Sequence, residues 1–177
     1  MSKVYGDALF AAAKDLAAID QAYEEVTALR DIFAENTDLR KILNSPKISR
    51  EEKAQIIHTI FEHQVSDMLM GFLIAVVNKG RQAEFERIFS YFISIVKEYK
   101  GIGVASVVSA MPLTKSQEEE IEKKLLATTE YNQMEMNYSV DESLIGGMTI
   151  RIKDRVIDSS IKTKLYNIKK NLLNVQI

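Results

Sequence analysis

The 177-residue sequence contains no cysteine, only two histidines and only two prolines. Without cysteine the chain forms no disulfide and performs no thiol chemistry, which fits a reducing compartment. His58 and His63 lie five positions apart and would point to different sides of a helix, so they do not match two ligands of one metal ion. We interpret both as surface or boundary residues and expect neither a metal site nor a cofactor.

The sequence also lacks an excess of either charge and any long apolar run. The formal net charge is −2 and the isoelectric point is near 5.8, whereas a nucleic-acid-binding domain usually carries a basic surface. The longest apolar run, Met68 to Val77, is much shorter than the about 20 residues that cross a bilayer. The first residues, MSKVYGDALFAAAK, resemble neither a signal peptide nor a transit peptide. We therefore expect no nucleic-acid partner, and a membrane association only through a partner.

Motifs that carry chemistry are missing as well. Gly146-Gly147 lacks the downstream Lys-Ser/Thr of a phosphate loop and opens a strand, so a role in packing is the better interpretation. The run Glu118–Glu120 suits the start of a helix, where acids interact favourably with the helix dipole. The four lysines between Lys162 and Lys170 fit either a solvated helix end or a site for an acidic partner. We expect no catalytic residue, because no cluster of titratable groups stands out.

What the sequence does contain, up to about residue 100, is helical periodicity. A first helix face is predicted by residues three or four apart, namely Tyr5, Leu9, Ala12, Leu16, Ile19 and Tyr23. A second helix is predicted by the same spacing in Ala22, Val26, Leu29 and Phe33. A short third helix carries Leu39, Ile42 and Leu43 and stops before Pro46.

Capping signals delimit the next three predicted helices. Ser49 and Glu52 form a capping-box pattern for a fourth helix, whose apolar residues are Ile56, Ile57, Ile60 and Phe61. Ser66 or Asp67 caps a fifth helix, which ends at Asn78 to Gly80. A sixth runs to Gly101, with the inward residues Phe85, Ile88, Phe92, Ile95 and Tyr99. Residues 1–103 are therefore predicted to form a six-helix bundle.

The period changes after Gly101. Residues 104–111 read as a strand, Thr114 and Gln117 form a second capping box for a helix to about Thr128, and residues 133–140 alternate strictly. The alternating face of that second strand consists of Met134, Met136, Tyr138 and Val140. Met148, Ile150 and Ile152 predict a further strand, followed by a turn at Asp154-Arg155 and a short strand at Val156-Ile157.

A last helix, capped by Asp158 or Ser159, is predicted to carry Ile161, Leu165, Ile168 and Leu172 on one face. Residues 104–177 are thus expected to form a small α/β unit whose thin core depends on a partner. The predicted class of the whole chain is α+β, mainly α.

Two of the predicted helices have more apolar surface than one buried stripe requires. The first has small residues outside its stripe, namely Ala8, Ala11, Ala13 and Ala17. The fifth, MLMGFLIAVV, is apolar nearly all round. All-round apolarity means either full burial or a second contact. Two interpretations follow from the residues alone: a central core helix, or a groove for an amphipathic partner helix.

Three segments resemble a known family. YGDALFAAA (5–13) resembles its first-helix motif, VVSAMPLTKSQ (107–117) its junction of strand, proline and helix start, and VDESLIGGMTIRIKDRVIDSSI (140–161) its C-terminal signature. The family is that of the δ subunit of bacterial F-type ATP synthase, the counterpart of the mitochondrial oligomycin sensitivity-conferring protein. The resemblance extends over essentially the whole length, with Ser159 at a position where the family usually has glycine.

The resemblance implies a non-catalytic stator subunit, peripheral at the cytoplasmic face of a bacterial cell membrane. Such a subunit links the catalytic head to the membrane-anchored b subunits and resists rotor torque during proton-driven ATP synthesis. In the family, the helical bundle holds the N-terminal helix of an α subunit between its first and fifth helices, and the C-terminal part contacts the b subunits. The groove residues expected on this basis are Tyr5, Leu9, Ala12, Ala13, Phe72, Val76 and Lys79. The expected structural or docking residues of the signature are Leu144, Gly146, Gly147, Asp158 and Ser160.

Two other classes of protein compete with this interpretation. A general helical adaptor would also bind an amphipathic partner helix, but it would have no reason to carry the C-terminal signature. A small enzyme with its site between the two halves would need a convergent cluster of titratable groups.

Overall fold

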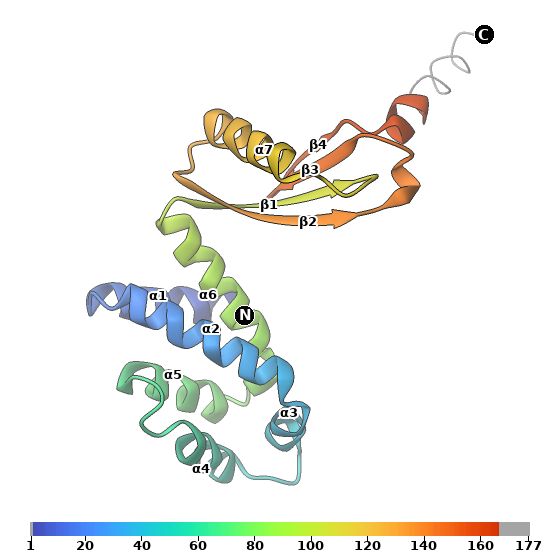
Figure 1. Cartoon of the computed structure of the whole chain (residues 1–177). Coiled ribbons are helices and arrows are strands. Elements are labelled where there is room, and N and C mark those ends of the chain that lie inside the picture. Colours follow the sequence, from blue (N-terminus) through green and yellow to red (C-terminus); the bar gives the residue numbers. More distant parts are fainter. Residues whose placement is uncertain (1, 167–177) are drawn as a thin grey trace, which may run out of the picture. The chain divides into compact units, whose positions relative to one another are not determined.

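The structure is a computed structural model that describes residues 2–166. The chain divides into two compact units between Lys97 and Glu98, six residues before the predicted boundary. The first unit is helical, and the second is built around a four-stranded sheet (Figure 1). The chain is therefore mostly helical with a small sheet in its C-terminal part, which confirms the α+β class.

The first unit contains α-helices joined by short connections. Their bounds are α1 Ser2–Asp15, α2 Ile19–Glu35, α3 Thr37–Asn44, α4 Arg50–Phe61, α5 Asp67–Asn78 and α6 Phe85–Tyr99. A 3-10 turn, η1 Gln82–Glu84, precedes α6 and was not expected from the sequence. The capping box of Ser49 and Glu52 is formed as predicted, and Ser66 caps α5.

The core of this unit centres on four phenylalanine rings from α2, α4 and α6. Phe33 packs against Phe61, Phe85 and Phe89, with ring centroids 5.2–6.0 Å apart. Offset and edge-on aromatic pairs of this kind add to the stabilisation that burial of their area provides. The predicted stripe of α2 is buried in full, and its residues are Ala22, Val26, Leu29 and Phe33.

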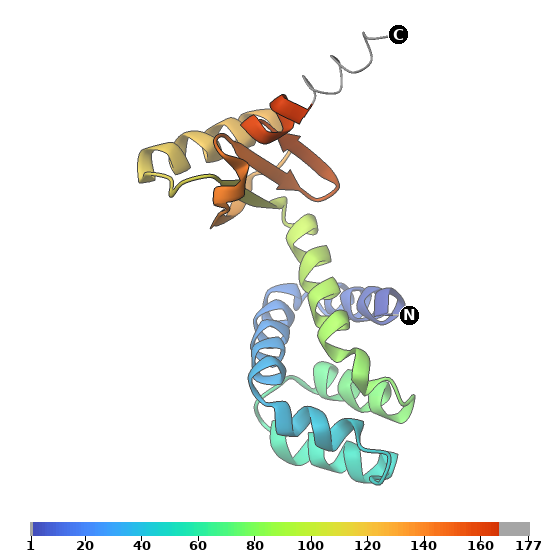
Figure 2. The same cartoon turned by 90° about the vertical axis from the view of Figure 1, so that its right-hand side faces the viewer.

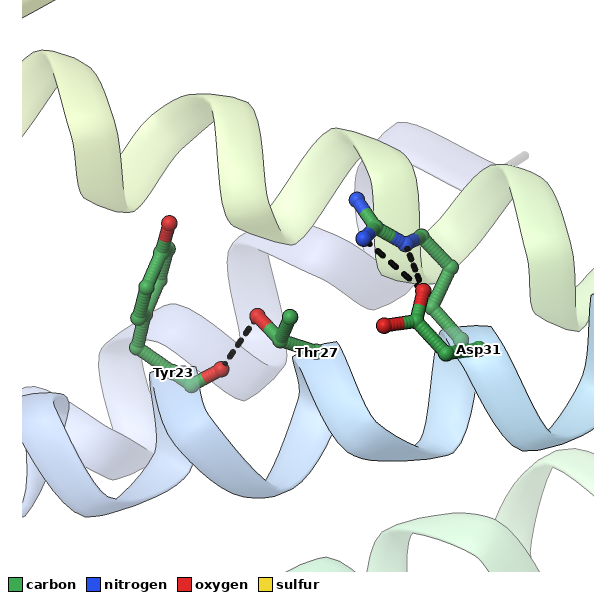
Figure 3. Close-up of polar contacts among 4 residues, drawn as sticks. Tyr23, Thr27 and Asp31 are labelled. Atoms are coloured by element: carbon green, nitrogen blue, oxygen red, sulfur yellow. Dashed lines mark hydrogen bonds and ion pairs between the residues drawn. The ribbon is translucent and has the colours of Figure 1, made fainter. Parts of the chain in front are cut away.

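The polar side of α2 satisfies its groups locally (Figure 3). The Thr27 hydroxyl donates to the Tyr23 carbonyl at 2.7 Å, and the Arg30 guanidinium donates to Asp31 at 2.9 Å. The Thr27 bond returns a hydroxyl to the carbonyl four residues earlier, which is a common local bond of threonine in helices. Tyr23, Thr27 and Arg30 are half-buried, and Tyr23 also packs against the core, so this side of α2 lies at the boundary between core and solvent.

The predicted first stripe is wrong in one respect, because it runs across two helices. α1 ends at Asp15 and α2 begins at Ile19, and Leu16 between them is 63 % exposed. The break is a Schellman motif: the Ala18 N–H donates to Ala13 O and the Ala17 N–H to Lys14 O. Ala17 takes the left-handed conformation with φ of 51°. Tyr99, expected to point inward from α6, is 57 % exposed at the end of that helix.

The second unit is a sheet with one covering helix. The strands are β1 Ile102–Ser109, β2 Gln133–Val140, β3 Met148–Ile152 and β4 Arg155–Asp158, in the order β2-β1-β3-β4. β1 pairs in parallel with β2 and antiparallel with β3, and β3 and β4 form a hairpin. The parallel pair needs a crossover, and the capping-box helix α7 (Lys115–Thr128) supplies it.

α7 lies along one face of the sheet (Figures 1 and 2). The second unit has a small core of its own. In it, Ile121 and Leu125 of α7 pack against Ala105, Val107, Met134 and Ile152 of the sheet. The predicted alternation of β2 is kept along the strand, but burial decreases along it. Met134 is buried and Met136 half-buried, whereas Tyr138 and Val140 are exposed, although the Tyr138 hydroxyl still donates to Glu118 O of α7. A 3-10 turn, η2 (Glu142–Leu144), and a helical turn at residues 161–166 complete the described part.

Candidate protein-interaction surfaces

α1 has two apolar sides. Gly6, Leu9 and Ala13 are buried in the bundle core. The opposite side exposes Val4, Ala8 and Ala11, with Val4 66 % exposed. Tyr5 and Ala12 lie between the two sides and are half-buried. α1 thus retains an apolar face that its own bundle does not cover, which we call the outer face of α1 (Val4, Tyr5, Ala8, Ala11, Ala12).

The third side of α1 is polar and is held by α6. The Tyr91 hydroxyl donates to Asp7 Oδ1 at 3.1 Å, and Lys3 Nζ lies 6.0 Å from the centre of the Tyr91 ring. These contacts set the rotation of α1 about its axis, because they hold one side of the helix against α6. The outer face is therefore held in a defined direction.

α5 is apolar nearly all round, with Asp67 and Asn78 at its two ends, and it is likewise left uncovered on one side. Its buried residues are Leu69, Leu73, Val76 and Val77. Gly71 and Ala75 are exposed on the opposite side, flanked by half-buried residues, namely Met68, Met70, Phe72 and Ile74. We call Met68, Gly71, Phe72 and Ala75 the outer face of α5. α1 and α5 contact one another in the bundle.

These positions revise the expected groove residues. Leu9, Ala13 and Val76 are at most 1 % exposed and lie in the core, so they cannot touch a partner while the bundle is folded. Tyr5, Ala12 and Phe72 are half-buried, and Lys79 is exposed as the C-cap of α5. The expected groove residues did not include Val4, Gly71 or Ala75, which are exposed, and the exposed Ala8 and Ala11 were expected only as small residues outside the first stripe. Helical spacing shows that two apolar sides exist, but only the packing of neighbouring helices decides which side is buried.

The C-terminal signature forms a hairpin closed by backbone contacts. The Ser159 N–H donates to Met148 O and the Ile161 N–H to Gly146 O, both at 2.9 Å. Gly147 has φ of +80°, and a Cβ added there would lie 2.5 Å from Ser159 O. Only glycine fits such a position without a shift of the backbone. The glycine pair thus has the packing role that the sequence indicated.

Asp158 and Ser160 organise the end of the hairpin. Asp158 Oδ1 accepts a hydrogen bond from the Ser160 N–H at 2.8 Å, and its Oδ2 accepts one from the Thr163 hydroxyl at 2.7 Å. The bond from the Ser160 backbone, followed by the Ser160 and Thr163 side chains, lowers the pKa of Asp158 to about 2.

The predicted cap of the last helix is corrected by these bonds. The buried Ser160 hydroxyl accepts from the Thr163 N–H, and Ser160 O accepts from the Lys164 N–H. Ser160 is therefore the N-cap, in place of Asp158 or Ser159. The predicted turn in the hairpin also shifts by one residue, to Lys153-Asp154, because β4 begins at Arg155.

Exposed apolar side chains gather around this signature. Ile145 is 68 % exposed, with φ of 67°, and Ile161 and Leu165 are 43 % and 52 % exposed. Ile161 lies against Gly146, where an added Cβ would be 2.6 Å from its Cδ1. Leu144 and Gly146 are half-buried, whereas Gly147 and Asp158 are exposed. Ile168, Leu172, Lys169 and Lys170 lie outside the described residues.

Residues 2–166 contain no group of three or more His, Cys, Asp or Glu side chains that could hold a metal ion. His58 and His63 are exposed, and each lies near one oxygen of Glu62, at 3.8 and 3.9 Å. In the described part of the chain, no helix has the length and apolar character needed to cross a membrane.

Two partly uncovered apolar faces on one unit and an apolar end on the other are features typical of proteins that dock on other proteins. Comparison with known proteins agrees: residues 1–172 match the model of the ATP synthase delta (OSCP) subunit family. ATP synthase subunit delta of Lachnoclostridium phytofermentans is 49 % identical over 177 residues, covering 100 % of this chain and 97 % of the relative. The subunit delta of Brevibacillus brevis is 32 % identical, covering 93 % and 94 %. A chain of the Toxoplasma gondii mitochondrial ATP synthase hexamer has the same fold, with a TM-score of 0.78, 21 % identity and coverage of 98 % and 97 %.

The chain belongs to the ATP synthase delta (OSCP) subunit family. It is accordingly a non-catalytic, peripheral-stalk (stator) subunit of ATP synthase, associated with the membrane through the complex. Membership across residues 1–172 sets aside both the general adaptor and the small enzyme.

Proposed function

We propose that the helical unit binds the N-terminal helix of an ATP synthase α subunit on the outer faces of α1 and α5. The observation that carries this proposal is the second apolar side of each helix. Burial of one stripe is enough to hold a helix in a small bundle, so the exposed side chain of Val4 adds nothing to the core. Ala8 and Ala75 favour the helical conformation but leave the surface around them without polar groups. An amphipathic helix laid on these faces would bury them.

The second unit contacts the membrane-anchored b subunits through the apolar residues around the signature. Ile145, Ile161 and Leu165 carry this assignment, because each is an aliphatic side chain at least 43 % exposed. Each predicted domain thus binds one partner: residues 1–103 bind the catalytic head, and residues 104–177 bind the b subunits of the stalk. The subunit would then lie at the cytoplasmic face of a bacterial cell membrane.

A stator must hold the head against rotor torque, so both contacts need slow dissociation under load. Apolar anchors at the centre of an interface supply this better than rim ion pairs. The small residues of the outer faces allow large side chains of a partner to approach closely and become fully desolvated.

The proposal is tested by isothermal titration of the full chain with a synthetic peptide of an α-subunit N-terminus. Ala8→Asp and Ala75→Asp place a charge on the outer faces, and we expect each to weaken binding by at least about 10-fold because the charge is desolvated on binding. Ala28→Asp, at an exposed position of α2, is the matched control and should bind like the original chain. Full-strength binding by both face variants would refute this location.

The stalk contact is tested separately, by capture of the chain on an immobilised soluble fragment of a b subunit. Leu165→Asp should reduce capture while binding of the α-subunit peptide stays unchanged, because the two surfaces belong to different units. A Leu165→Asp variant captured at full strength would contradict the assignment.

A further inference from the structure

Gly71 stands in the middle of α5 (Asp67–Asn78). Glycine in a helix interior is unfavourable relative to alanine, because its backbone loses more freedom when it is ordered. A glycine at such a position therefore calls for a reason, which is usually either a positive φ or a neighbouring group that leaves no room for a Cβ.

The other six glycines of the chain have such a reason within the chain itself. Three of them have positive φ, namely Gly80, Gly101 and Gly147. The other three would place a Cβ within 2.6 Å of a neighbouring side chain, namely Gly6, Gly103 and Gly146. Gly6 is the informative comparison, since it also lies inside a helix: its Cβ would be 2.5 Å from Cδ1 of Tyr91 on α6.

Gly71 has neither reason. A Cβ built there meets no heavy atom within 4 Å, and the residue is exposed. On the helix surface, Ala75 lies one turn further along, while Met68 and Phe72 stand on one side and Met70 and Ile74 on the other, all four half-buried. The α5 backbone at Gly71 is therefore accessible from outside between two rows of larger apolar side chains.

We propose that Gly71 is the point of closest approach between α5 and the partner helix, and that it limits which helices bind. This inference rests on the proposed binding of an α-subunit helix. The distance between packed helix axes depends on the side chains at the contact, so a glycine there admits a branched aliphatic side chain of the partner directly onto the α5 backbone. In the free chain, Gly71 makes α5 less stable than alanine at the same position would. In the complex, the partner helix fills the space where a Cβ would otherwise stand.

The experiment measures stability and binding on the same variants of the full chain. Gly71→Ala should raise the Tm by about 2–4 °C, because it removes the cost of glycine and adds no clash in the free chain. The same variant should bind the α-subunit N-terminal peptide about fivefold more weakly, because the added methyl group occupies the contact. Gly71→Leu should fold normally and bind at least about 50-fold more weakly.

Ala28→Gly on the exposed side of α2 is the matched control, expected to lower the Tm by a similar amount and to leave peptide binding unchanged. Two results would overturn the inference while the proposed function stands: a Gly71→Ala chain that binds as tightly as the original, or one whose Tm does not rise. Failure of the original chain to bind the peptide would instead overturn the proposed function, and this inference with it.

Discussion

At the scale of single residues, two helix ends use the same turn with different side chains. α5 ends in a Schellman motif in which the Arg81 N–H donates to Val76 O and Gly80 has φ of 68°. α1 ends in the same pattern with Ala17 at the left-handed position. An alanine there costs about 1 kcal/mol relative to glycine, because its Cβ crowds the following carbonyl.

We therefore expect Ala17→Gly to stabilise the first unit by up to about 1 kcal/mol, and Gly80→Ala to destabilise it by a similar amount. Urea unfolding followed by circular dichroism measures both. A less stable Ala17→Gly chain would show that relief of strain at the left-handed position is smaller than the extra entropy that glycine gives the unfolded chain.

Asp158 makes a pH-dependent contribution at the end of the signature. Its pKa is lowered to about 2 by the hydrogen bonds of Ser160 and Thr163. Because the folded-state pKa of Asp158 is lowered, its carboxylate stabilises the fold at pH values above the ordinary aspartate pKa of 3.8. This contribution to stability is lost as the pH falls from about 4 to about 2. Nuclear magnetic resonance titration of the Asp158 carboxyl carbon should show the low midpoint, and Thr163→Val should raise it. An unshifted midpoint near 3.8 would mean that the hydrogen bonds from Ser160 and Thr163 to Asp158 are not formed in solution.

At the scale of helices and strands, local signals in the sequence were the most informative. Both capping boxes form as predicted, and α7 and β2 occupy residues close to those expected, because caps and strict alternation depend on neighbours within a few positions. The break after α1 was missed because no glycine or proline marks it; the left-handed residue is Ala17. The outer faces could be predicted only as an excess of apolar residues, since the side that is buried depends on long-range packing.

Mutation of each capping box should destabilise only the helix that the box begins, α4 or α7. Ser49→Ala and Thr114→Ala each remove the side chain that accepts from the N3 backbone, and we expect each to cost about 1 kcal/mol. Hydrogen exchange should quicken in α4 for the first variant and in α7 for the second. Ser90→Ala, at an exposed position of α6, is the control and should change the free energy of unfolding by less than about 0.5 kcal/mol. Equal quickening throughout the chain would contradict this local picture.

At the scale of the whole molecule, the two hydrophobic clusters share no residue. Val76→Asp buries an unpaired charge in the first cluster, which costs several kcal/mol, so we expect loss of the helical unit while the sheet unit stays folded. Two-dimensional NMR spectra would show disappearance of the dispersed signals of residues 2–97 only. Ala75→Asp, one position earlier and exposed, should leave both sets in place. Loss of both sets in Val76→Asp would show that the sheet unit depends on the helical one.

The position of β1 in the middle of the sheet also has a consequence for synthesis on the ribosome. Its two neighbours, β2 and β3, begin at Gln133 and Met148, well after β1 has ended at Ser109. The nascent chain can complete the core of its first unit early, whereas β1 must wait with Val107 and Val108 unpaired until those later strands emerge. This interval is when the growing polypeptide is most open to self-association, and a chaperone that recognises short aliphatic stretches would find its target there.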